Sequence, residues 1–382
     1  MPAAMFPHAD SQLTIDLDAI LANWRRLDSL SPAQTATAAM VKANGYGLGA
    51  ARVGTMLAAA GCRHFFVASL SEAIDLAAAF RDAGQNDAAI MVLHGVQRGQ
   101  EADFAAAGLV PVLNDLEQLA RWRMCATKTG QKLPALLHFD TGMTRLGLDT
   151  TQTDWLINTP QALVGLDIRH IMSHLAAAEV PTDPTNQRQR DRFNAIRQFF
   201  PGLSASLANS AGCFLGSDYH FQMTRPGIAL YGIHPAGRPG DGLQPVLGWR
   251  ARIMQVRAAA AGDKVGYNGT VTLRRDSRIA TIGVGYADGY RRQLGGKASV
   301  RIGSATAPVI GRVSMDSITV DVTDLTADDL ATGRADLLHD AYDIHSMAID
   351  AGTIGYELIT QLGHRPARQY LGGPALRQPA TP

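Results

Sequence analysis

The chain of 382 residues has a net charge of +1 and is 46% hydrophobic. This size and composition suit one large or two medium domains with a sizeable core, and the near-zero charge offers no electrostatic footprint for nucleic acid. No apolar run approaches the roughly 20 residues of a membrane span, so neither a nucleic acid nor a membrane is expected as a partner.

The amino-terminal stretch and the cysteines together favour a cytoplasmic location. Residues 1–13 lack a basic start followed by an apolar segment, so no secretory signal is expected. Cys62, Cys125 and Cys213 are scattered and do not have the spacing of metal ligands. Their odd number favours free thiols in a reducing compartment.

The first two-thirds of the chain alternates short apolar runs with longer helical patterns. The helical patterns often begin with Ser, Asn or Asp and end at Gly or Pro, as at 71–84, 114–130 and 186–200. Eight strand candidates lie at 36–43, 64–69, 88–95, 109–114, 134–142, 167–175, 204–210 and 227–232. This alternation predicts an α/β fold, an N-terminal (β/α)8 TIM-type barrel over 1–240, with a doubly wound sheet as the main alternative.

A Pro/Gly-rich stretch at 234–245 indicates a linker, and the pattern changes after it. Alternating apolar residues and regularly placed glycines then suggest strands at 250–259, 278–290, 298–303, 307–315 and 317–323. We expect residues 241–382 to form a smaller C-terminal, mostly β domain.

Polar and reactive side chains follow several strand candidates of the predicted barrel. Lys42 ends the first, Arg145 follows the fifth, Asn209 and Ser210 end the seventh, and Arg225 introduces the eighth. Each has an ordinary explanation alone, such as a rim lysine, helix caps or surface ion pairs. Because the carboxyl ends of barrel strands form the working face, their convergence indicates a catalytic site.

The histidines allow a second interpretation of this rim. His138 and Asp140 are two apart on one predicted strand, and His170 and His174 are four apart on the next, so each pair is expected to share a face. Such a cluster suits a catalytic metal at a barrel mouth. Hydrogen-bonded histidines without a metal are the more common case for any one of them.

A lysine at a barrel rim suits Schiff-base chemistry with a carbonyl cofactor. If that cofactor is pyridoxal phosphate, the stretches 208–212 and 225–229 can supply backbone N–H groups and the Ser210 hydroxyl for its phosphate. An arginine beside the pyridine nitrogen cannot accept a proton, so it would leave that nitrogen neutral and the ring a weaker electron sink.

Nine motifs, in order, run nearly end to end through the chain. They are MVKANGYGLG, HFDTGMTRLGL, SHLA, ANSAG, RPGIALYG, VGYADGY, GRVSMDSITVDVT, GTIGYELIT and RPARQY. Together they resemble the bacterial alanine racemases. The resemblance implies pyridoxal 5'-phosphate as cofactor, a small amino acid as substrate, the barrel and β domain, and a head-to-tail homodimer with shared active sites. It also implies that the first strand, at about 11–16, pairs with the β domain.

The resemblance assigns the catalytic roles by position in these motifs. Lys42 is similar to the Schiff-base lysine, which is also the base on one face, and Tyr267 to the opposite base, contributed across the dimer interface. His174 would hydrogen-bond Arg225 and Tyr267, and Arg225 would contact the pyridine nitrogen. Arg145 would bind the phenolic oxygen of the cofactor and the substrate carboxylate.

Further binding roles carry over in the same way. The backbone N–H of Met315 would hold the substrate carboxylate from the partner chain. Tyr286 and Asp316 match positions that line the substrate pocket and its entrance. The resemblance places around the cofactor, most of them at its phosphate, the residues Tyr46, Asn209, Ser210, Gly227, Ile228 and Tyr356.

One position departs from the pattern of the family. Many members carry a carbamylated lysine seven residues before the arginine equivalent to Arg145, and here that position is His138. An anion that would orient Arg145 is therefore missing. We expect a chloride, a water or Asp140 to fill this place.

The resemblance implies interconversion of L- and D-alanine by two bases, with D-alanine supplied for peptidoglycan. Lysine and tyrosine ordinarily titrate near 10, so both bases need a lowered pKa at neutral pH. Neighbouring cations would provide this for Lys42, and the chain from His174 to Arg225 for Tyr267. Alternatives are a racemase of broader specificity for serine or larger amino acids, a carrier that only holds the cofactor, and a metal-dependent barrel hydrolase.

Overall fold

The computed structural model describes residues 8–237 and 241–373. Residues 238–240 of the expected linker lie outside this description. The described chain forms two compact units, one of Ala19–Gln244 and one of residues 8–18 with Pro245–Gly372, so the division falls at the end of the expected linker. No helix among the described residues is long and apolar enough to cross a membrane.

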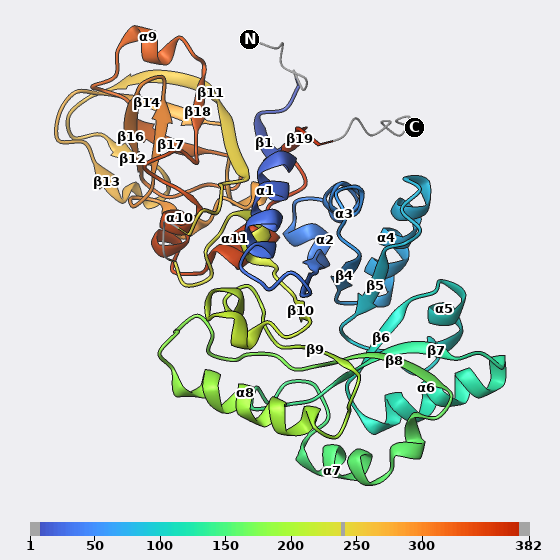
Figure 1. Ribbon diagram of the computed structural model, residues 1–382. Helices are drawn as coiled ribbons and strands as arrows, with labels where there is room; N and C mark the ends of the chain where they lie inside the picture. Colours follow the sequence, from blue (N-terminus) through green and yellow to red (C-terminus); the bar gives the residue numbers. More distant parts are fainter. Residues whose placement is uncertain (1–7, 238–240, 374–382) are drawn as a thin grey trace. The chain divides into compact units, whose positions relative to one another are not determined.

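The unit of Ala19–Gln244 has a curled parallel sheet with helices on its outside (Figure 1). Seven strands follow one another in the order β3, β4, β5, β6, β7, β8, β9, and the short strand β10 pairs with β2. The barrel strands are β2 (Ala36–Thr37), β3 (Ala39–Met40), β4 (His64–Val67), β5 (Ala89–Val92), β6 (Val110–Leu113), β7 (Leu133–His138), β8 (Leu166–Met172), β9 (Ser204–Ser206) and β10 (Met223–Thr224).

Backbone hydrogen bonds at β10 close the barrel. On one side the amide of Gln222 donates to the carbonyl of Ala205 (3.1 Å), and on the other the amide of Ala38 donates to the carbonyl of Thr224 (2.9 Å). The predicted (β/α)8 architecture is confirmed. The doubly wound alternative is excluded, because an open sheet leaves its two edge strands unpaired.

The eighth strand was placed wrongly by the sequence pattern. Residues 227–232 are not extended: Ile228–Tyr231 is a 3-10 helix, and the strand is β10 just before it. Ile228 and Leu230 are fully buried, and periodicity cannot distinguish a buried strand from a buried helical turn. The hydroxyl of Ser210 accepts the amides of Gly227 (2.7 Å) and Ala229 (3.3 Å), which stabilises the turn.

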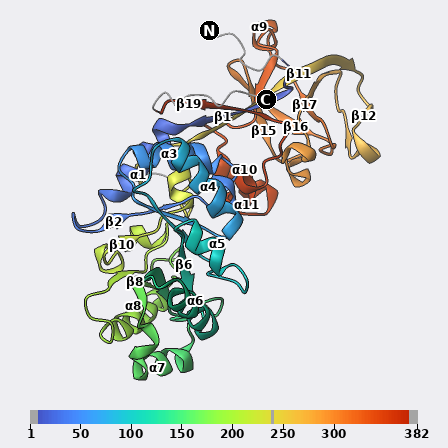
Figure 2. The same ribbon diagram turned by 90° about the vertical axis from the view of Figure 1, so that its right-hand side faces the viewer.

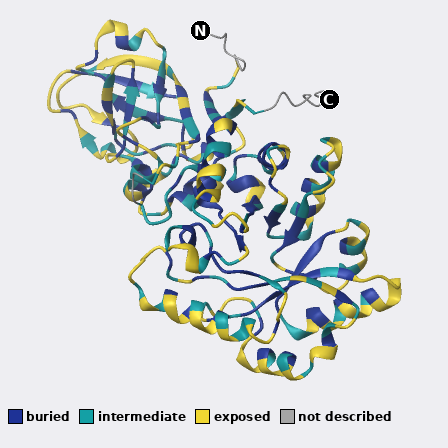
Figure 3. Ribbon diagram, in the orientation of Figure 1, coloured by how far each residue is buried: buried dark blue, intermediate teal, exposed yellow. Residues whose placement is uncertain are grey.

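Several helices of this unit begin at a side chain that caps them. Ser69 and Glu72 form a capping box at the start of α4, and Asp115 caps α6. Their apolar sides pack against the sheet while their outer sides are exposed, as the colours of Figure 3 show. The helices are α1 (Leu17–Asp28), α2 (Lys42–Tyr46), α3 (Ala50–Ala59), α4 (Leu70–Asp82), α5 (Glu101–Ala106), α6 (Leu116–Thr129), α7 (Thr150–Asn158) and α8 (Pro184–Arg197).

The other unit is built on an eight-stranded sheet with the order β14, β17, β16, β15, β18, β11, β1, β19. The first strand of the chain, β1, lies between β11 (antiparallel) and β19 (parallel), and the last pairing is visible in Figure 2. The strands are β1 (Ser11–Asp16), β11 (Leu247–Ala259), β12 (Lys264–Val265), β13 (Val271–Thr272), β14 (Ser277–Ile282), β15 (Ser299–Ile302), β16 (Ala305–Ile310), β17 (Ile318–Asp321), β18 (Arg334–Asp336) and β19 (Ala367–Leu371).

Three short helices complete this unit: α9 (Ala327–Leu330), α10 (Ile344–Ala351) and α11 (Gly355–Thr360). Leu13 and Ile15 of β1 are fully buried and alternate with partly exposed residues, as expected for a strand with one face on a core. The mostly β character expected after the linker is confirmed.

Two histidines from opposite sides of the barrel meet in its interior. The rings of His64 on β4 and His170 on β8 are 5.7 Å apart, edge to face, and Nδ1 of His170 is buried without a hydrogen-bond partner. Burial lowers the pKa of His170 to about 4, and it also lowers the pKa of His64. Both rings are therefore neutral in the folded protein at pH 7.

This pair predicts a loss of stability in mild acid. A histidine titrates near 6.5 when unfolded, so between that pH and the lowered pKa the unfolded chain binds more protons. Stability should fall with falling pH by about 1.4 kcal/mol per pH unit for each such ring. Urea unfolding of His170→Gln between pH 7 and 5 should show a shallower dependence than the unaltered protein. His94→Gln, at an exposed histidine, is the control; an unchanged slope in His170→Gln would contradict the prediction.

Candidate active site

The predicted rim residues of the barrel all follow the carboxyl ends of strands. Lys42 follows β3, His174 follows β8, Asn209 and Ser210 follow β9, and Arg225 follows β10 directly. The carboxyl ends of parallel barrel strands lie at one mouth, so these side chains belong to that mouth, and their catalytic role stays a prediction.

Lys42 stands at the start of the short helix α2 and is partly buried. Burial lowers the pKa of its amine, and the positive charge of Arg145 lowers this pKa further, whereas Glu72 opposes the shift. A larger fraction of Lys42 is consequently uncharged at neutral pH than for an exposed lysine. An uncharged amine can attack a carbonyl carbon and can accept a proton.

Arg225 is buried and its hydrogen-bond partners in the described chain are neutral. Its guanidinium donates to the hydroxyl of Ser206, to the carbonyl of Ser173 (2.6 Å) and to that of Leu207 (3.4 Å). Burial lowers the pKa of Arg225 to about 10, so it remains charged at pH 7. A buried cation held by neutral groups adds a positive field to the mouth and can donate to a bound acceptor, but it cannot give up its proton there.

Ser210 forms a small polar cradle with the turn after Arg225. Its hydroxyl oxygen accepts two backbone amides, from Gly227 and Ala229, so its own hydrogen remains available for a bound anion. At Gly227 a Cβ atom would come within 2.2 Å of the Tyr46 hydroxyl, so only glycine lets these segments approach. Tyr46 in turn packs on Tyr231 with ring centroids 4.8 Å apart.

His138, the position that departs from the pattern of the resemblance, is held as a neutral ring. The amide nitrogen of Asn114 donates to the carbonyls of Leu93 (2.9 Å) and Val112 (3.0 Å), so its oxygen must accept from Nδ1 of His138 (2.7 Å). Burial and then Arg225 lower the pKa of His138 to about 3. The ring therefore offers a lone pair on Nε2 and carries no negative charge.

Asp140 is occupied by its own loop. Its carboxylate oxygens accept the amides of Gly142 (2.8 Å), Met143 (2.8 Å) and Thr144 (2.9 Å). Arg145, the next residue of this loop, is exposed. Of the three groups suggested for the missing anion, Asp140 is thus already engaged, and chloride or water remains the prediction.

The metal-binding interpretation gains no support. Among residues 8–237 and 241–373 no group of three or more His, Cys, Asp or Glu side chains could hold a metal ion. The expected pairing of side chains on strands is also wrong: β7 ends at His138 and β8 at Met172, so Asp140 and His174 lie in loops. Two residues share a face of a strand only if the strand includes both of them, and here each strand ends before the second residue of its pair.

His174 lies close to several positive charges. Burial, followed by Arg225, Arg145, His138 and Lys42, holds the pKa of His174 well below its usual value. Its backbone carbonyl accepts the buried side chain of Gln189 on α8 (2.9 Å), whose oxygen accepts the amide of Ala176 (2.8 Å). Helix α8 thereby fixes the loop that carries His174.

The remaining predicted residues belong to the second unit. Tyr267, in a 3-10 turn at Tyr267–Gly269, is 67% exposed, and Met315 is 53% exposed. Tyr286 and Asp316 are also exposed, while Tyr356 on α11 is partly buried. Tyr267, Tyr286 and Met315 are thus large side chains that the described chain by itself leaves exposed.

One arginine connects the loops that carry these residues. Arg365 donates with Nε and one Nη to both oxygens of buried Asp288 (2.9 Å each) and with its other Nη to Asp316 (2.6 Å). Asp288 also accepts the amide of Gly285 (2.8 Å), and the amide of Tyr286 donates to the carbonyl of Ser314 (3.1 Å). The bidentate pair and its third bond therefore hold Tyr286 and Asp316 in a fixed relation.

We call the hydrogen bonds of Arg365 to Asp288 and Asp316 the Arg365 clamp. Weakening this clamp should affect substrate binding more than the stability of the fold. In Arg365→Lys one ammonium replaces three directed donors, and we expect KM for the small amino acid that the family resemblance implies to rise about tenfold while kcat changes less than about threefold. Steady-state kinetics and thermal unfolding check this. Arg275→Lys, at an exposed arginine–aspartate pair, is the control and should change neither. An unchanged KM in Arg365→Lys would show that the clamp has no part in substrate binding.

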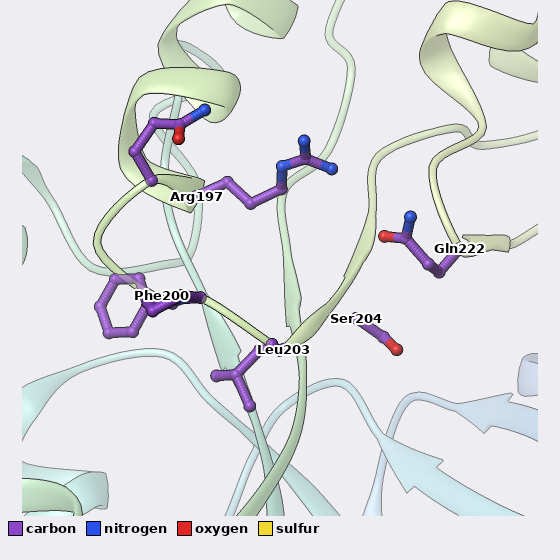
Figure 4. A pocket seen from close by; sticks show the side chains of 8 residues that line it. Arg197, Phe200, Leu203, Ser204 and Gln222 are labelled. Atoms are coloured by element: carbon purple, nitrogen blue, oxygen red, sulfur yellow. The ribbon is translucent and has the colours of Figure 1, made fainter.

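A cavity of about 340 Å³ lies at the opposite end of the barrel from the rim residues. Its lining comes from the end of α8 and from the residues at the start of β9 and before β10, as Arg197, Phe200, Ser204 and Gln222 show in Figure 4. Since these are the amino ends of the strands, the cavity is separate from the candidate active site.

The fold and the rim define a two-domain protein, a (β/α)8 barrel with a lysine at its mouth followed by a β domain. Comparisons with known proteins agree. The model of the alanine racemase N-terminal domain matches residues 15–235, and that of the alanine racemase C-terminal domain matches residues 246–370. The chain therefore belongs to the alanine racemase family.

Individual relatives are similar over nearly their full length. The chain is 45% identical to alanine racemase of Brucella ovis over 373 residues (94% of this chain, 93% of the relative), and 47% identical to that of Acidiphilium cryptum over 354 residues (92% and 96%). The crystal structure of alanine racemase from Bartonella henselae, which has covalently bound pyridoxal phosphate, matches with a TM-score of 0.89 and 38% identity, covering 95% of this chain and all of that one.

Proposed function

We propose that this protein interconverts L- and D-alanine with pyridoxal 5'-phosphate bound at the barrel mouth, and that it supplies D-alanine for peptidoglycan in the cytoplasm. The observation that carries the proposal is the position of Lys42 at the barrel mouth, directly after β3, with Arg225 following β10 and His174 following β8. Burial and the charge of Arg145 lower the pKa of its amine. A reactive amine among cations is what a cofactor with an aldehyde and a phosphate requires.

The residues present fit this cofactor. Lys42 would hold it covalently, and Ser210 with the Gly227 turn and Tyr46 would receive the phosphate. Arg225 is a buried donor without a carboxylate partner in the described chain, suited to a ring nitrogen that stays unprotonated. When bound, pyridoxal phosphate supplies a conjugated ring that withdraws electrons from the α carbon of the amino acid.

The chain's own groups would move the proton. Racemisation removes the α proton on one face and returns a proton on the other, so two bases on opposite faces need not move. The Lys42 amine would accept or donate at Nζ, and the Tyr267 phenol at Oη. Arg145 would hold the substrate carboxylate through its guanidinium, and Met315 through its backbone N–H. Arg225 would keep the electron sink weak and so limit stray protonation at the cofactor.

A second copy of the chain would complete each site. Tyr267 and Met315, in the β unit, are exposed in the single protomer and carry two of the roles assigned above. A head-to-tail homodimer would cover them and bring the phenol of one protomer to the barrel of its partner.

The test is a panel of L-amino acids incubated with the purified protein and pyridoxal phosphate, with D-product measured by chiral chromatography. We expect D-alanine to accumulate until the enantiomers are equal, because their free energies are the same. Faster conversion of L-serine or of larger amino acids would replace the proposal by a racemase of broader specificity. A protein that stays colourless and yields no D-product would overturn it.

A further inference from the structure

We propose that Glu72 is a positioning residue for Lys42, in that its carboxylate holds the strained turn immediately after the lysine. This inference rests on the proposed function, since it presumes that Lys42 carries the cofactor. Glu72 is on α4, and neither the motifs nor the family resemblance assigned it a role.

The turn after Lys42 is strained. Ala43, Asn44, Gly45 and Tyr46 all have positive φ, at 52°, 52°, 62° and 55°. Three of these residues have a Cβ atom, and the left-handed helical conformation costs such a residue about 1 kcal/mol or more. A left-handed turn of this length persists only where the surroundings determine it.

Hydrogen bonds within the turn account for part of this support. The amide of Gly45 donates to the carbonyl of Val41 (2.8 Å), and that of Gly47 donates to the carbonyl of Ala43 (2.8 Å). The Asn44 side chain accepts the amide of Ala50 (2.9 Å). These contacts are local and leave the amide of Ala43, the residue next to Lys42, to be bound from outside.

Glu72 provides that outside contact. One carboxylate oxygen accepts the amide of Ala43 (2.6 Å), and the other accepts the amides of Ala68 (2.8 Å) and Ser69 (3.3 Å). The second set belongs to the start of α4, which anchors the carboxylate on a 13-residue helix. A single side chain thus ties the lysine turn to a rigid element, and charge-assisted bonds of this kind are among the strong ones.

The charge of Glu72 also acts on the lysine. The groups around the Lys42 amine are Arg145, which lowers its pKa, and Glu72, which raises it against the larger effect of burial. His174 also lies close enough to sense the charge of Lys42. Glu72 is therefore expected to limit how far the amine loses its proton, besides fixing its backbone.

Three variants divide the roles of Glu72. Glu72→Ala removes the contact to Ala43 and the charge. Glu72→Gln removes the charge and keeps one acceptor oxygen, which can serve either Ala43 or the pair Ala68 and Ser69. Ser69→Ala removes the other half of the same capping box and does not touch Ala43. If Glu72 only caps α4, Ser69→Ala and Glu72→Ala should change the apparent Kd for pyridoxal phosphate by the same factor.

The experiment uses the full-length proteins with two measurements. Pyridoxal phosphate is titrated into cofactor-free protein, with borohydride trapping at Lys42 to confirm the attachment point. We expect Glu72→Ala to raise the apparent Kd about tenfold or more, and Ser69→Ala to change it less than about twofold. In the absence of cofactor, acetylation of Lys42 is followed by peptide mass spectrometry across pH. Its midpoint should fall by about half a pH unit or more in Glu72→Gln.

The outcomes distinguish the two levels of the argument. If the unaltered protein forms no adduct at Lys42, the proposed function fails. If it forms the adduct but Glu72→Ala binds the cofactor no more weakly than Ser69→Ala, Glu72 is a helix cap and the inference is wrong. If the midpoint does not move in Glu72→Gln, the electrostatic part of the inference is wrong.

Discussion

Replacing Lys42 with alanine should abolish the yellow chromophore formed with pyridoxal phosphate and reduce alanine racemisation by about 10³-fold or more. The variant removes both the covalent attachment point and one of the two bases, and losses of this order are typical when a group with both duties is deleted. Absorbance spectra and racemisation rates measured with the cofactor in excess provide the check.

A second lysine variant of the same chain serves as the control for a loss of folding. Lys297→Ala removes an exposed lysine of the β unit and should retain colour and rate. Thermal unfolding of both variants should resemble that of the unaltered protein. Activity at the unaltered level in Lys42→Ala would overturn the central assignment.

Replacing Tyr267 with phenylalanine should slow racemisation by about 10²–10⁴-fold, the usual contribution of a positioned proton donor and acceptor. The loss in kcat/KM must be equal in the two directions, since the equilibrium constant between enantiomers is one. Any asymmetry must therefore be sought in the first proton transfer.

Exchange of the α proton with deuterated water reveals that asymmetry. In Tyr267→Phe the enantiomer whose proton faces Lys42 should still exchange, whereas the enantiomer whose proton faces residue 267 should exchange at least about tenfold more slowly. Tyr219→Phe, at a partly exposed tyrosine of the barrel, is the control. Equal suppression for both enantiomers would contradict the assignment of two separate bases.

The same two variants test whether the site is shared between protomers. If each site takes Lys42 from one chain and Tyr267 from its partner, a mixed dimer of Lys42→Ala and Tyr267→Phe has one site with both residues and one with neither. Random exchange of subunits should then restore up to about a quarter of the unaltered activity. No recovery after verified exchange would place both residues within one chain.

The alternation of apolar runs and helical patterns was enough to predict a (β/α)8 barrel followed by a mostly β unit. Each barrel strand is short, but its apolar run is bounded by turn residues, and several helices carry their own cap, such as Asp115 at α6. Such signals are local in the chain. The predicted position of the eighth strand was wrong because the apolar run Ile228–Tyr231 has no local feature that distinguishes a buried turn from a strand.

The residues of the candidate site likewise divide into those that the sequence predicted and those that only the structure revealed. Lys42, Ser210 and Arg225 could be proposed because each stands where a strand ends and the barrel brings such ends together. Glu72 and Arg365 could not, although Ser69 and Glu72 have the spacing of a capping box. Their partners, Ala43 and Asp288, are 29 and 77 residues away, so these contacts exist only after folding.

Residue types and their order were thus sufficient for the class of fold, the family and the reactive groups, since periodicity, caps and motifs depend on neighbours along the chain. The state of those groups was decided in three dimensions: the lowered pKa of Lys42, the neutral tautomer of His138 and the engagement of Asp140. Burial, charge and hydrogen bonding depend on which distant segments meet, and no local pattern records that.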